Sequence, residues 1–253
     1  MVTSMPANPE SQWFGETRVT PEEKTGRVIN VFDSVASKYD VMNDLMSGGV
    51  HRLWKNHLIR KIRPRAGLHY LDVAGGTGDI AFRIRERVGT NASITLCDLN
   101  AEMLSVGRDR AIDRGYTDLK WITGNAESLP IPSNSVDVYT IAFGLRNVTH
   151  IDTALSEALR VLKPGGRFYC LEFSRVDEPF LARAYDAFSF GVIPRIGQLV
   201  AKDRESYQYL VESIRKFPPQ PALKRRMELA GFSQCRFENL SFGVAAIHSG
   251  VKI

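Results

Sequence analysis

A short glycine-rich loop between a predicted strand and a predicted helix constrains the fold of this chain more than any other feature. Residues 72–79 read DVAGGTGD and follow the apolar segment LHYL. The pattern GTGDIA at residues 76–81 fits the G-x-G-x-x-G/A fingerprint of a nucleotide-binding strand–helix unit. Asp98 ends the next predicted strand about 20 residues further on, as the fingerprint requires. The sequence therefore predicts a Rossmann-like α/β fold with a ligand at this loop.

Carboxylates at both ends of the loop restrict the ligand. Asp72 and Asp79 would repel the pyrophosphate of a dinucleotide lying against the loop and the helix N-terminus. S-adenosylmethionine carries a sulfonium, an ammonium and a ribose but no phosphate, so we expect the acids to hold its cationic end and Asp98 to accept hydrogen bonds from both ribose hydroxyls. Asp79 has a second interpretation, as a residue that caps the helix N-terminus. The loop residues expected at the cofactor are Asp72, Gly75, Gly76, Thr77 and Gly78.

Strand-like and helix-like segments alternate along the middle of the chain. From Leu68 the order is LHYLDVA, DIAFRIRERV, SITLCDL, AEMLSVGRDRAIDRG, LKWITG, VDVYTIAF, DTALSEALRVL and RFYCLEF. This alternation is typical of a mostly parallel sheet with helices on both faces. Near the C-terminus, FSQCRFENL and FGVAAIHSGV meet at a tight connection around Ser241. They predict an antiparallel hairpin.

These patterns divide the chain into five parts. We expect a flexible N-terminus (1–18), a helical cap (19–66), the cofactor-binding α/β core (67–173), a helical and aromatic-rich insertion (174–216), and a C-terminal helix and hairpin that complete the core (217–253). The first helix of the cap has an apolar face that recurs at steps of three and four, made of Val28, Val31, Phe32, Val35, Tyr39 and Met42.

The second helix of the cap, from about Val50 to Ile62, belongs to an unusually basic stretch. Residues 51–65 include Arg and Lys but no Asp or Glu. Clustered cations can gain about 1 kcal/mol each near an anionic membrane surface. The stretch is therefore interpreted either as a docking site for a membrane or a partner, or as an ordinary solvated surface.

Composition narrows the class of protein without choosing a function. The chain has 253 residues, of which 43% are hydrophobic and 24% charged, and it has no apolar run of the roughly 20 residues that a membrane span needs. The net charge of +5 allows nucleic acid, an anionic surface or acidic partners. Cys97, Cys170 and Cys235 lack the close spacing of a zinc site, so we expect no metal and interpret them as buried thiols in a reducing compartment.

Polar residues follow two further predicted strands. Asn125 and Ala126 come after LKWITG, where an amide and an adjacent backbone N–H could read an adenine edge. Arg146 and Asn147 come after VDVYTIAF. An arginine at this position is either a surface charge or a group that holds an anion over the cofactor, and we favour the second interpretation.

Several longer motifs resemble one enzyme family. FDSVASKYDVMNDLMSGGVHRLWK, LDVAGGTGDIAFR, GNAESLP, FGLRNV, RVLKPGGRFYCLEFS and YQYLVESIRKFPPQ are similar to the ubiquinone/menaquinone biosynthesis C-methyltransferases. The resemblance covers roughly residue 14 to the C-terminus. It implies a class I methyltransferase fold with a seven-stranded sheet, and methylation of a ring carbon of a polyprenyl benzoquinol or a demethylmenaquinol by S-adenosylmethionine.

The resemblance also assigns residues. Cofactor contacts are implied at Thr77, Asp98, Asn125 and Ala126. Ala142 is a further expected cofactor-binding position. It stands where many bacterial members have a serine, so the contact from a serine hydroxyl is not expected here. Together with THID and GRFYCLEF, this alanine resembles the mitochondrial branch and its alphaproteobacterial relatives. We therefore expect ubiquinone rather than menaquinone synthesis.

Methylation of a ring carbon needs an electron-rich ring, so the acceptor should be the reduced quinol in its ionised form. Arg146 could stabilise the ring oxyanion, with Asn147 orienting the ring, because a guanidinium stays protonated and is a poor base. His150 is a candidate proton acceptor and alternatively a loop-capping residue. Tyr39 is interpreted either as part of a lid over the site or as a core aromatic.

The resemblance extends to location and partners. The insertion 174–216 is expected to form an apolar channel for the isoprenoid tail, or alternatively a contact in a homodimer. We expect a peripheral protein on the inner membrane face, in the bacterial cytoplasm or the mitochondrial matrix, that meets other quinone-synthesis proteins and no nucleic acid. One competing class is an RNA methyltransferase, which should carry an amine-methylation motif that is missing here. The other is a cofactor-binding scaffold, which predicts an eroded glycine loop or a lost Arg146, whereas both are intact in this sequence.

Overall fold

The computed structural model describes residues 13–15, 17–35, 44, 47–176 and 204–253. Its centre is a seven-stranded sheet with the strand order β5-β4-β3-β6-β7-β9-β8. The first five strands in this order are parallel, and β9 pairs antiparallel with both β7 and β8. The strands are β3 (His69–Val73), β4 (Ser93–Asp98), β5 (Lys120–Thr123), β6 (Val136–Ala142), β7 (Leu162–Phe173), β8 (Ser233–Leu240) and β9 (Ala245–Val251). The predicted sheet and the terminal hairpin around Ser241 are confirmed.

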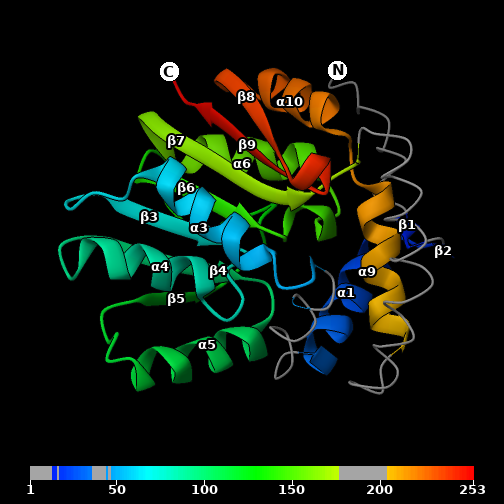
Figure 1. Ribbon diagram of the computed structural model, residues 1–253, viewed down its shortest axis with the longest axis horizontal. Coiled ribbons are helices and arrows are strands. Elements are labelled where there is room, and N and C mark those ends of the chain that lie inside the picture. The colour runs from blue at the N-terminus through cyan, green and yellow to red at the C-terminus, as the bar shows by residue number, and fades with distance from the viewer. Residues whose placement is uncertain (1–12, 16, 36–43, 45–46, 177–203) are drawn as a thin grey trace.

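Helices cover both faces of this sheet (Figure 1). One hydrophobic cluster packs one face against α3 (His51–Ile62), α4 (Asp79–Val88) and α5 (Ala101–Asp113). A second cluster packs the other face against α6 (Ile151–Val161) and α10 (Gln220–Leu229). The strands carry near-continuous apolar runs because parallel strands are buried on both faces. All three cysteines are buried, as expected.

Two further helices lie beyond the carboxyl ends of the parallel strands, α1 (Pro21–Val35) and α9 (Arg204–Lys216) (Figure 1). They stand beside a small hairpin of β1 (Trp13–Phe14) and β2 (Thr17–Arg18), which the sequence analysis did not predict. Ligands of open α/β sheets bind at this end of the sheet. The cap and part of the insertion are therefore positioned to cover a site there.

The start of α1 is fixed by a capping box. The backbone N–H of Glu23 donates to Thr20 Oγ1 at 3.2 Å, and the N–H of Thr20 donates to Glu23 Oε2 at 2.9 Å. This satisfies backbone donors that the first turn leaves without an intrahelical partner. Tyr39 and Met42, which the predicted apolar face includes, lie outside the described residues.

Candidate functional site

A cavity opens at the carboxyl ends of β3, β4, β5 and β6. Its space amounts to about 770 Å³ when the open mouth is counted. Loops that follow the four strands form its floor, and Val28, Ile29 and Phe32 of α1 form an apolar cover. We call it the strand-end cavity. The sheet topology alone explains its position, because parallel strands bring their carboxyl ends to one edge.

The glycine loop and Asp98 form one hydrogen-bonded unit at this cavity. Gly76 N–H donates to Asp98 Oδ2 at 2.8 Å, and Asn100 N–H donates to Oδ1 at 2.8 Å. Burial raises the pKa of Asp98, and these two backbone donors oppose the shift. Gly78 has φ +89°, and a Cβ there would lie 2.8 Å from the Phe82 ring. Each carboxylate oxygen retains lone pairs, so Asp98 can still accept hydrogen bonds from a ligand.

Asp72 lies beneath the loop and does not line the strand-end cavity. Its side chain is 1% exposed, and Oδ1 accepts a hydrogen bond from Thr140 Oγ1 at 2.7 Å. Oδ2 has no hydrogen-bond partner among the described residues. A Cβ at Gly75 would lie 3.1 Å from this oxygen. Burial raises the pKa of Asp72 to about 7, so the acid is poised between its two charge states under the glycine loop.

We expect Asp72→Asn to stabilise the protein more as the pH rises. The folded state binds the Asp72 proton more tightly than the unfolded state, whose pKa stays near 3.8. Wild-type stability therefore falls as the pH rises from about 4 to about 7. The advantage of the variant in free energy of unfolding should grow by roughly 1.4 kcal/mol per pH unit between pH 5 and pH 7, and level off above. Urea denaturation of both proteins from pH 5 to pH 8 measures this, and a pH-independent difference would contradict it.

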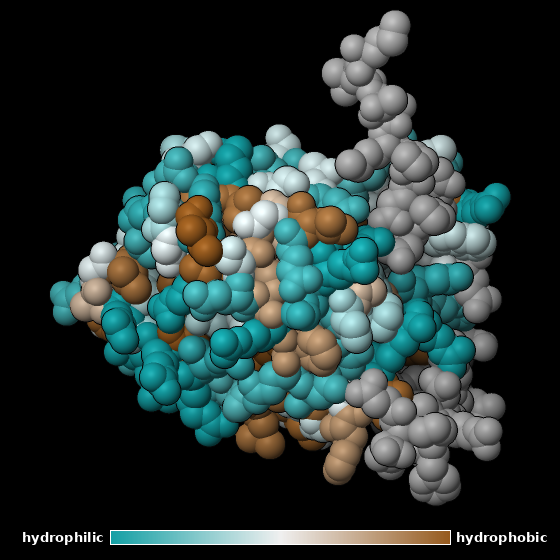
Figure 2. All heavy atoms as spheres, turned by 90° about the horizontal axis from the view of Figure 1, so that it is seen from above, coloured by the Kyte–Doolittle hydropathy of each residue, from teal (hydrophilic) through white to brown (hydrophobic). Residues whose placement is uncertain are grey.

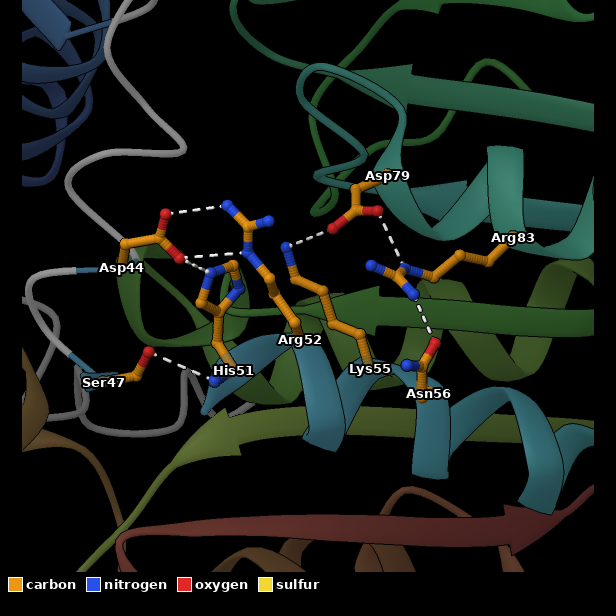
Figure 3. A network of polar contacts seen from close by, with 8 residues as sticks. All are labelled: Asp44, Ser47, His51, Arg52, Lys55, Asn56, Asp79 and Arg83. Carbon is orange, nitrogen blue, oxygen red and sulfur yellow. Dashed lines mark hydrogen bonds and ion pairs between the residues drawn. The ribbon is translucent and has the colours of Figure 1, made fainter. Parts of the chain in front are cut away.

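Asp79 belongs to an ion-pair network on the outer side of the loop (Figure 3). Its Oδ2 accepts from Lys55 Nζ at 2.7 Å and its Oδ1 from Arg83 Nε at 2.8 Å. Burial alone would raise the pKa of Asp79, but the two cations lower it to about 2. Gly78 occupies the N-cap position of α4, and the Asp79 side chain instead ties α3 to α4. Thr77 is buried on this side and does not line the strand-end cavity.

Ion pairs within the protein involve several cations of the basic stretch at residues 51–65, which was interpreted either as a docking site or as a solvated surface. Arg52 makes two hydrogen bonds to Asp44, and Lys55 pairs with Asp79 (Figure 3). Further along the helix, Lys61 pairs with Glu238 at 2.7 Å. Carboxylates from three other parts of the chain therefore neutralise cations of α3. The pairs with Asp79 and Glu238 link the helix to α4 and to β8.

Asn125 and Ala126 both line the strand-end cavity, as expected of residues near an adenine. Asn125 Oδ1 accepts from the N–H of Glu127 at 2.9 Å, which shapes the turn after β5. Glu127 then binds the loop after β6: its Oε1 accepts from the N–H groups of Thr149 and His150, and its Oε2 lies 2.6 Å from His150 Nδ1. His150 does not line the cavity. Its proposed role as proton acceptor stays a prediction.

Arg146 and Asn147 lie on η3 (Leu145–Asn147), a short 3₁₀ helix after β6. Asn147 lines the strand-end cavity, whereas Arg146 lines a smaller second cavity of about 420 Å³. The Arg146 side chain is 1% exposed and donates through Nη1 to Glu172 Oε1 at 2.8 Å and to the carbonyl of Phe143. Burial raises the pKa of Glu172 and the Arg146 charge opposes this. The guanidinium charge is thus balanced inside the protein, which the sequence analysis did not foresee.

The loops after β3 and β6 approach each other closely. A Cβ at Gly144 would lie 2.3 Å from the Cβ of Ala74, and Ala74 has φ +50°. Glycine is therefore required at position 144. Ala142, which ends β6 just before this contact, does not line the strand-end cavity.

Polar contacts hold α1 over the cavity. Asn100 caps α5 by accepting from Met103 N–H, and its Nδ2 donates to Asp33 Oδ1 of α1 at 2.7 Å. At the other end of α1, Lys24 Nζ donates to the carbonyl of Val148 at 3.0 Å. These contacts were not predicted from the sequence, although asparagine is a preferred N-cap residue and Asn100 directly precedes α5. Tyr39, the predicted lid residue, lies outside the described residues.

The sequence model of the family described as "ubiE/COQ5 methyltransferase family" matches residues 19–252 of this chain. The chain belongs to this family. A relative from Methylobacterium nodulans, named "Ubiquinone/menaquinone biosynthesis C-methyltransferase UbiE", is 57% identical over 98% of this chain and 100% of its own length. A rice relative, named "2-methoxy-6-polyprenyl-1,4-benzoquinol methylase, mitochondrial", is 54% identical over 95% of this chain and 88% of its own. The resemblance described from the motifs is confirmed, and the chain is a methyltransferase.

Solved structures show the same fold at low sequence identity. A SAM-dependent methyltransferase from Aquifex aeolicus matches with a TM-score of 0.57 and 16% identity, over 79% of this chain and 89% of that one. The cyclase SpnF matches with a TM-score of 0.66 and 18% identity, over 90% and 96%. The predicted class I methyltransferase fold is confirmed. Because a cyclase shares this fold, the fold by itself does not determine the reaction.

Proposed function

We propose that this methyltransferase transfers a methyl group from S-adenosylmethionine to a ring carbon of a 2-polyprenyl-6-methoxy-1,4-benzoquinol. The observation that carries the proposal is the 54% identity to the rice benzoquinol methylase over nearly the whole chain. Bovine and bacterial relatives with corresponding names support it. The name of the Methylobacterium relative also supports a demethylmenaquinol as a second acceptor.

The residues of the strand-end cavity fit the cofactor. Asp98 lines the cavity with a carboxylate that would accept hydrogen bonds from the ribose hydroxyls, and Asn125 and Ala126 line the same cavity and would contact the adenine. Asp72 Oδ2, which has no hydrogen-bond partner among the described residues, lies under the glycine loop and would add negative potential for a cationic ligand if Asp72 is ionised. The apolar face of α1 excludes water from above. When bound, S-adenosylmethionine supplies an electrophilic methyl group.

The protein's contribution to the reaction is to hold the acceptor ring and favour its ionised oxygen. Asn147 lines the strand-end cavity beside Phe143 and Val148, which provide an apolar wall for a ring. Arg146 adds a positive charge close by, but Glu172 balances it at 2.8 Å. We therefore assign Arg146 the role of holding the loop around the cavity, with a secondary electrostatic effect on the ring oxygen.

The compartment follows the relatives, which include bacterial proteins and proteins named as mitochondrial. They support the bacterial cytoplasm or the mitochondrial matrix. Among the described residues, no helix is both long and apolar enough to cross a membrane. The face in Figure 2 is mainly hydrophilic, with hydrophobic side chains in small separate groups. Peripheral contact with the inner membrane is supported by the lipid acceptor and the exposed Leu53 and Arg60 of α3.

Association with other quinone-synthesis proteins, like a homodimer contact through the insertion, stays a prediction from the resemblance. The rival activity, RNA methylation, has the same cofactor, so cofactor binding alone does not separate the two. The acceptor decides between them.

The function is tested by two measurements on one preparation. Calorimetric titration with S-adenosylhomocysteine should show binding at a single site. Mass spectrometry of a reduced short-chain demethyl benzoquinol incubated with S-adenosylmethionine should show the mass of one added CH₂ unit on the ring, and the oxidised quinone should stay unchanged. Binding without methylation would overturn the assigned acceptor and leave the cofactor assignment intact.

A further inference from the structure

Two cavities meet at η3, and neighbouring residues of this short helix face different ones. Asn147 lines the strand-end cavity, while Arg146 lines the second cavity. Val148 and Thr149 line both cavities and so form their common wall. Tyr209 of α9 lines the second cavity. The wall between the cavities is thus formed by the loop after β6, and α9 lies on the side of the second cavity.

A hydrogen bond crosses this wall. The Tyr209 hydroxyl donates to Asn147 Oδ1 at 3.1 Å. The Tyr209 side chain is buried, and its ring stacks on Phe14 with centroids 4.1 Å apart and an interplanar angle of 11°. Burial raises the pKa of Tyr209, so the phenol stays protonated and keeps its donor proton. A rigid, stacked ring therefore holds one end of the Asn147 amide.

An asparagine amide has one acceptor oxygen and a nitrogen with two donor hydrogens. We propose that Tyr209 is a positioning residue: by binding Asn147 Oδ1 from the second cavity, it turns the amide nitrogen toward the acceptor ring in the strand-end cavity. The donor hydrogens then stabilise the ionised ring oxygen. The inference rests on the proposed function and adds a residue to it.

The charge arrangement favours a neutral donor at this place. Arg146 is the buried cation on η3. Its Nη1 already donates hydrogen bonds to Glu172 and to the carbonyl of Phe143. A quinol oxygen beside Asn147 would meet the amide directly at the wall of its own cavity. In a water-poor site an oriented dipole stabilises developing charge without reorganising during the reaction.

Tyr209→Phe removes only the hydroxyl and tests the inference. We expect kcat for methylation of the reduced short-chain demethyl benzoquinol to fall about tenfold, the scale of one lost hydrogen bond. Affinity for S-adenosylhomocysteine and KM for the quinol should change less than about twofold. The acid limb of the kcat profile should move to higher pH, because a weaker donor raises the pKa of the bound ring hydroxyl. An unchanged pH profile would overturn the inference.

A double-mutant comparison separates positioning from packing. Once Asn147→Ala has removed the amide, adding Tyr209→Phe should lower kcat no further. Independent effects that multiply would overturn the proposal. Tyr70→Phe is the matched control, because it also removes a buried hydroxyl, one bound to Arg65 at the opposite end of the sheet. It should leave kcat and its pH profile unchanged.

A second variant keeps the test decisive if Tyr209→Phe does not fold. In Asn147→Asp the Tyr209 hydroxyl can still donate to a carboxylate oxygen, but no amide nitrogen remains. The kcat of this variant should fall at least as far as that of Asn147→Ala, and full activity would overturn the donor role. The wild-type protein is measured in every assay. If the wild type does not methylate the quinol, the proposed function is wrong. If both the wild type and Asn147→Asp methylate it normally, only the inference about Tyr209 and Asn147 is wrong.

Discussion

Replacement of Arg146 by alanine is expected to lower the free energy of unfolding by about 3–5 kcal/mol. Arg146 and Glu172 form a pair whose side chains are each 1% exposed, and Glu172 also accepts from the backbone N–H of Arg146 at 3.2 Å and of Phe173 at 2.9 Å. Without the guanidinium, the Glu172 carboxylate is left buried without its counter-charge, and the carbonyl of Phe143 loses a donor. Denaturant unfolding at pH 7 measures the loss.

The double variant Arg146→Met with Glu172→Leu separates the cost of an unpaired charge from the value of the pair. It should recover most of the lost stability, because replacing both partners of a buried pair by apolar groups is often nearly neutral. The matched control is Arg114→Ala, whose partner Glu86 is 3.8 Å away with both side chains about half exposed. That change should cost less than about 1 kcal/mol. Equal losses for Arg146→Ala and Arg114→Ala would show that burial of the pair is unimportant.

This expectation also determines how activity of an Arg146 variant is interpreted. Loss of turnover in Arg146→Ala can follow from a displaced loop as well as from a lost charge. Arg146→Lys retains the charge but cannot bind Glu172 and the Phe143 carbonyl with a fork of N–H groups. Turnover should therefore be compared at a temperature where each variant is folded.

Asp98→Ala is expected to weaken binding of S-adenosylhomocysteine by about a hundredfold or more, corresponding to two hydrogen bonds from ribose hydroxyls to a carboxylate. The substitution also removes the acceptor for Gly76 N–H and Asn100 N–H, so the glycine loop loses its link to the end of β4. Calorimetric titration of the folded variant measures the affinity.

Two companions make the Asp98 result specific. Asp98→Asn keeps an acceptor oxygen of similar size and should retain part of the affinity. Asp109→Asn removes a carboxylate from the exposed surface of α5 and should leave the affinity unchanged. If Asp98→Ala binds as tightly as the wild type, the assignment of this cavity to the cofactor is wrong.

Local patterns were enough to predict the framework of the protein. The alternation of strands and helices, the glycine loop and the terminal hairpin each leave a periodic or spacing signal within a few residues. The strand-end residues Asp98, Asn125 and Asn147 could be grouped in advance because parallel strands end at one edge of a sheet. A capping box at Thr20 and Glu23 was equally local, although the sequence analysis did not use it.

The partners of charged and polar groups depended on the tertiary structure. Lys55 and Asp79 are 24 residues apart, Lys61 and Glu238 are 177 apart, and Arg146 and Glu172 are 26 apart. No periodicity links such positions, because each pair is made by the packing of separate elements. The basic helix α3 illustrates the result. Its sequence indicates a surface that attracts anions, and two of its carboxylate partners, Asp79 and Glu238, reach it only when the glycine loop and the sheet are assembled.

The amino-acid sequence by itself determined the fold, the family and the edge of the sheet at which the site lies, since these depend on short-range patterns and on the geometry of parallel strands. Only the tertiary structure decided which residues face the strand-end cavity. Asp72 and Thr77 are buried and do not line this cavity. Arg146 pairs with Glu172, and Tyr209 binds Asn147, 62 residues away in the sequence. The physical reason is that side-chain direction and charge pairing are set by contacts between elements that are distant in the chain.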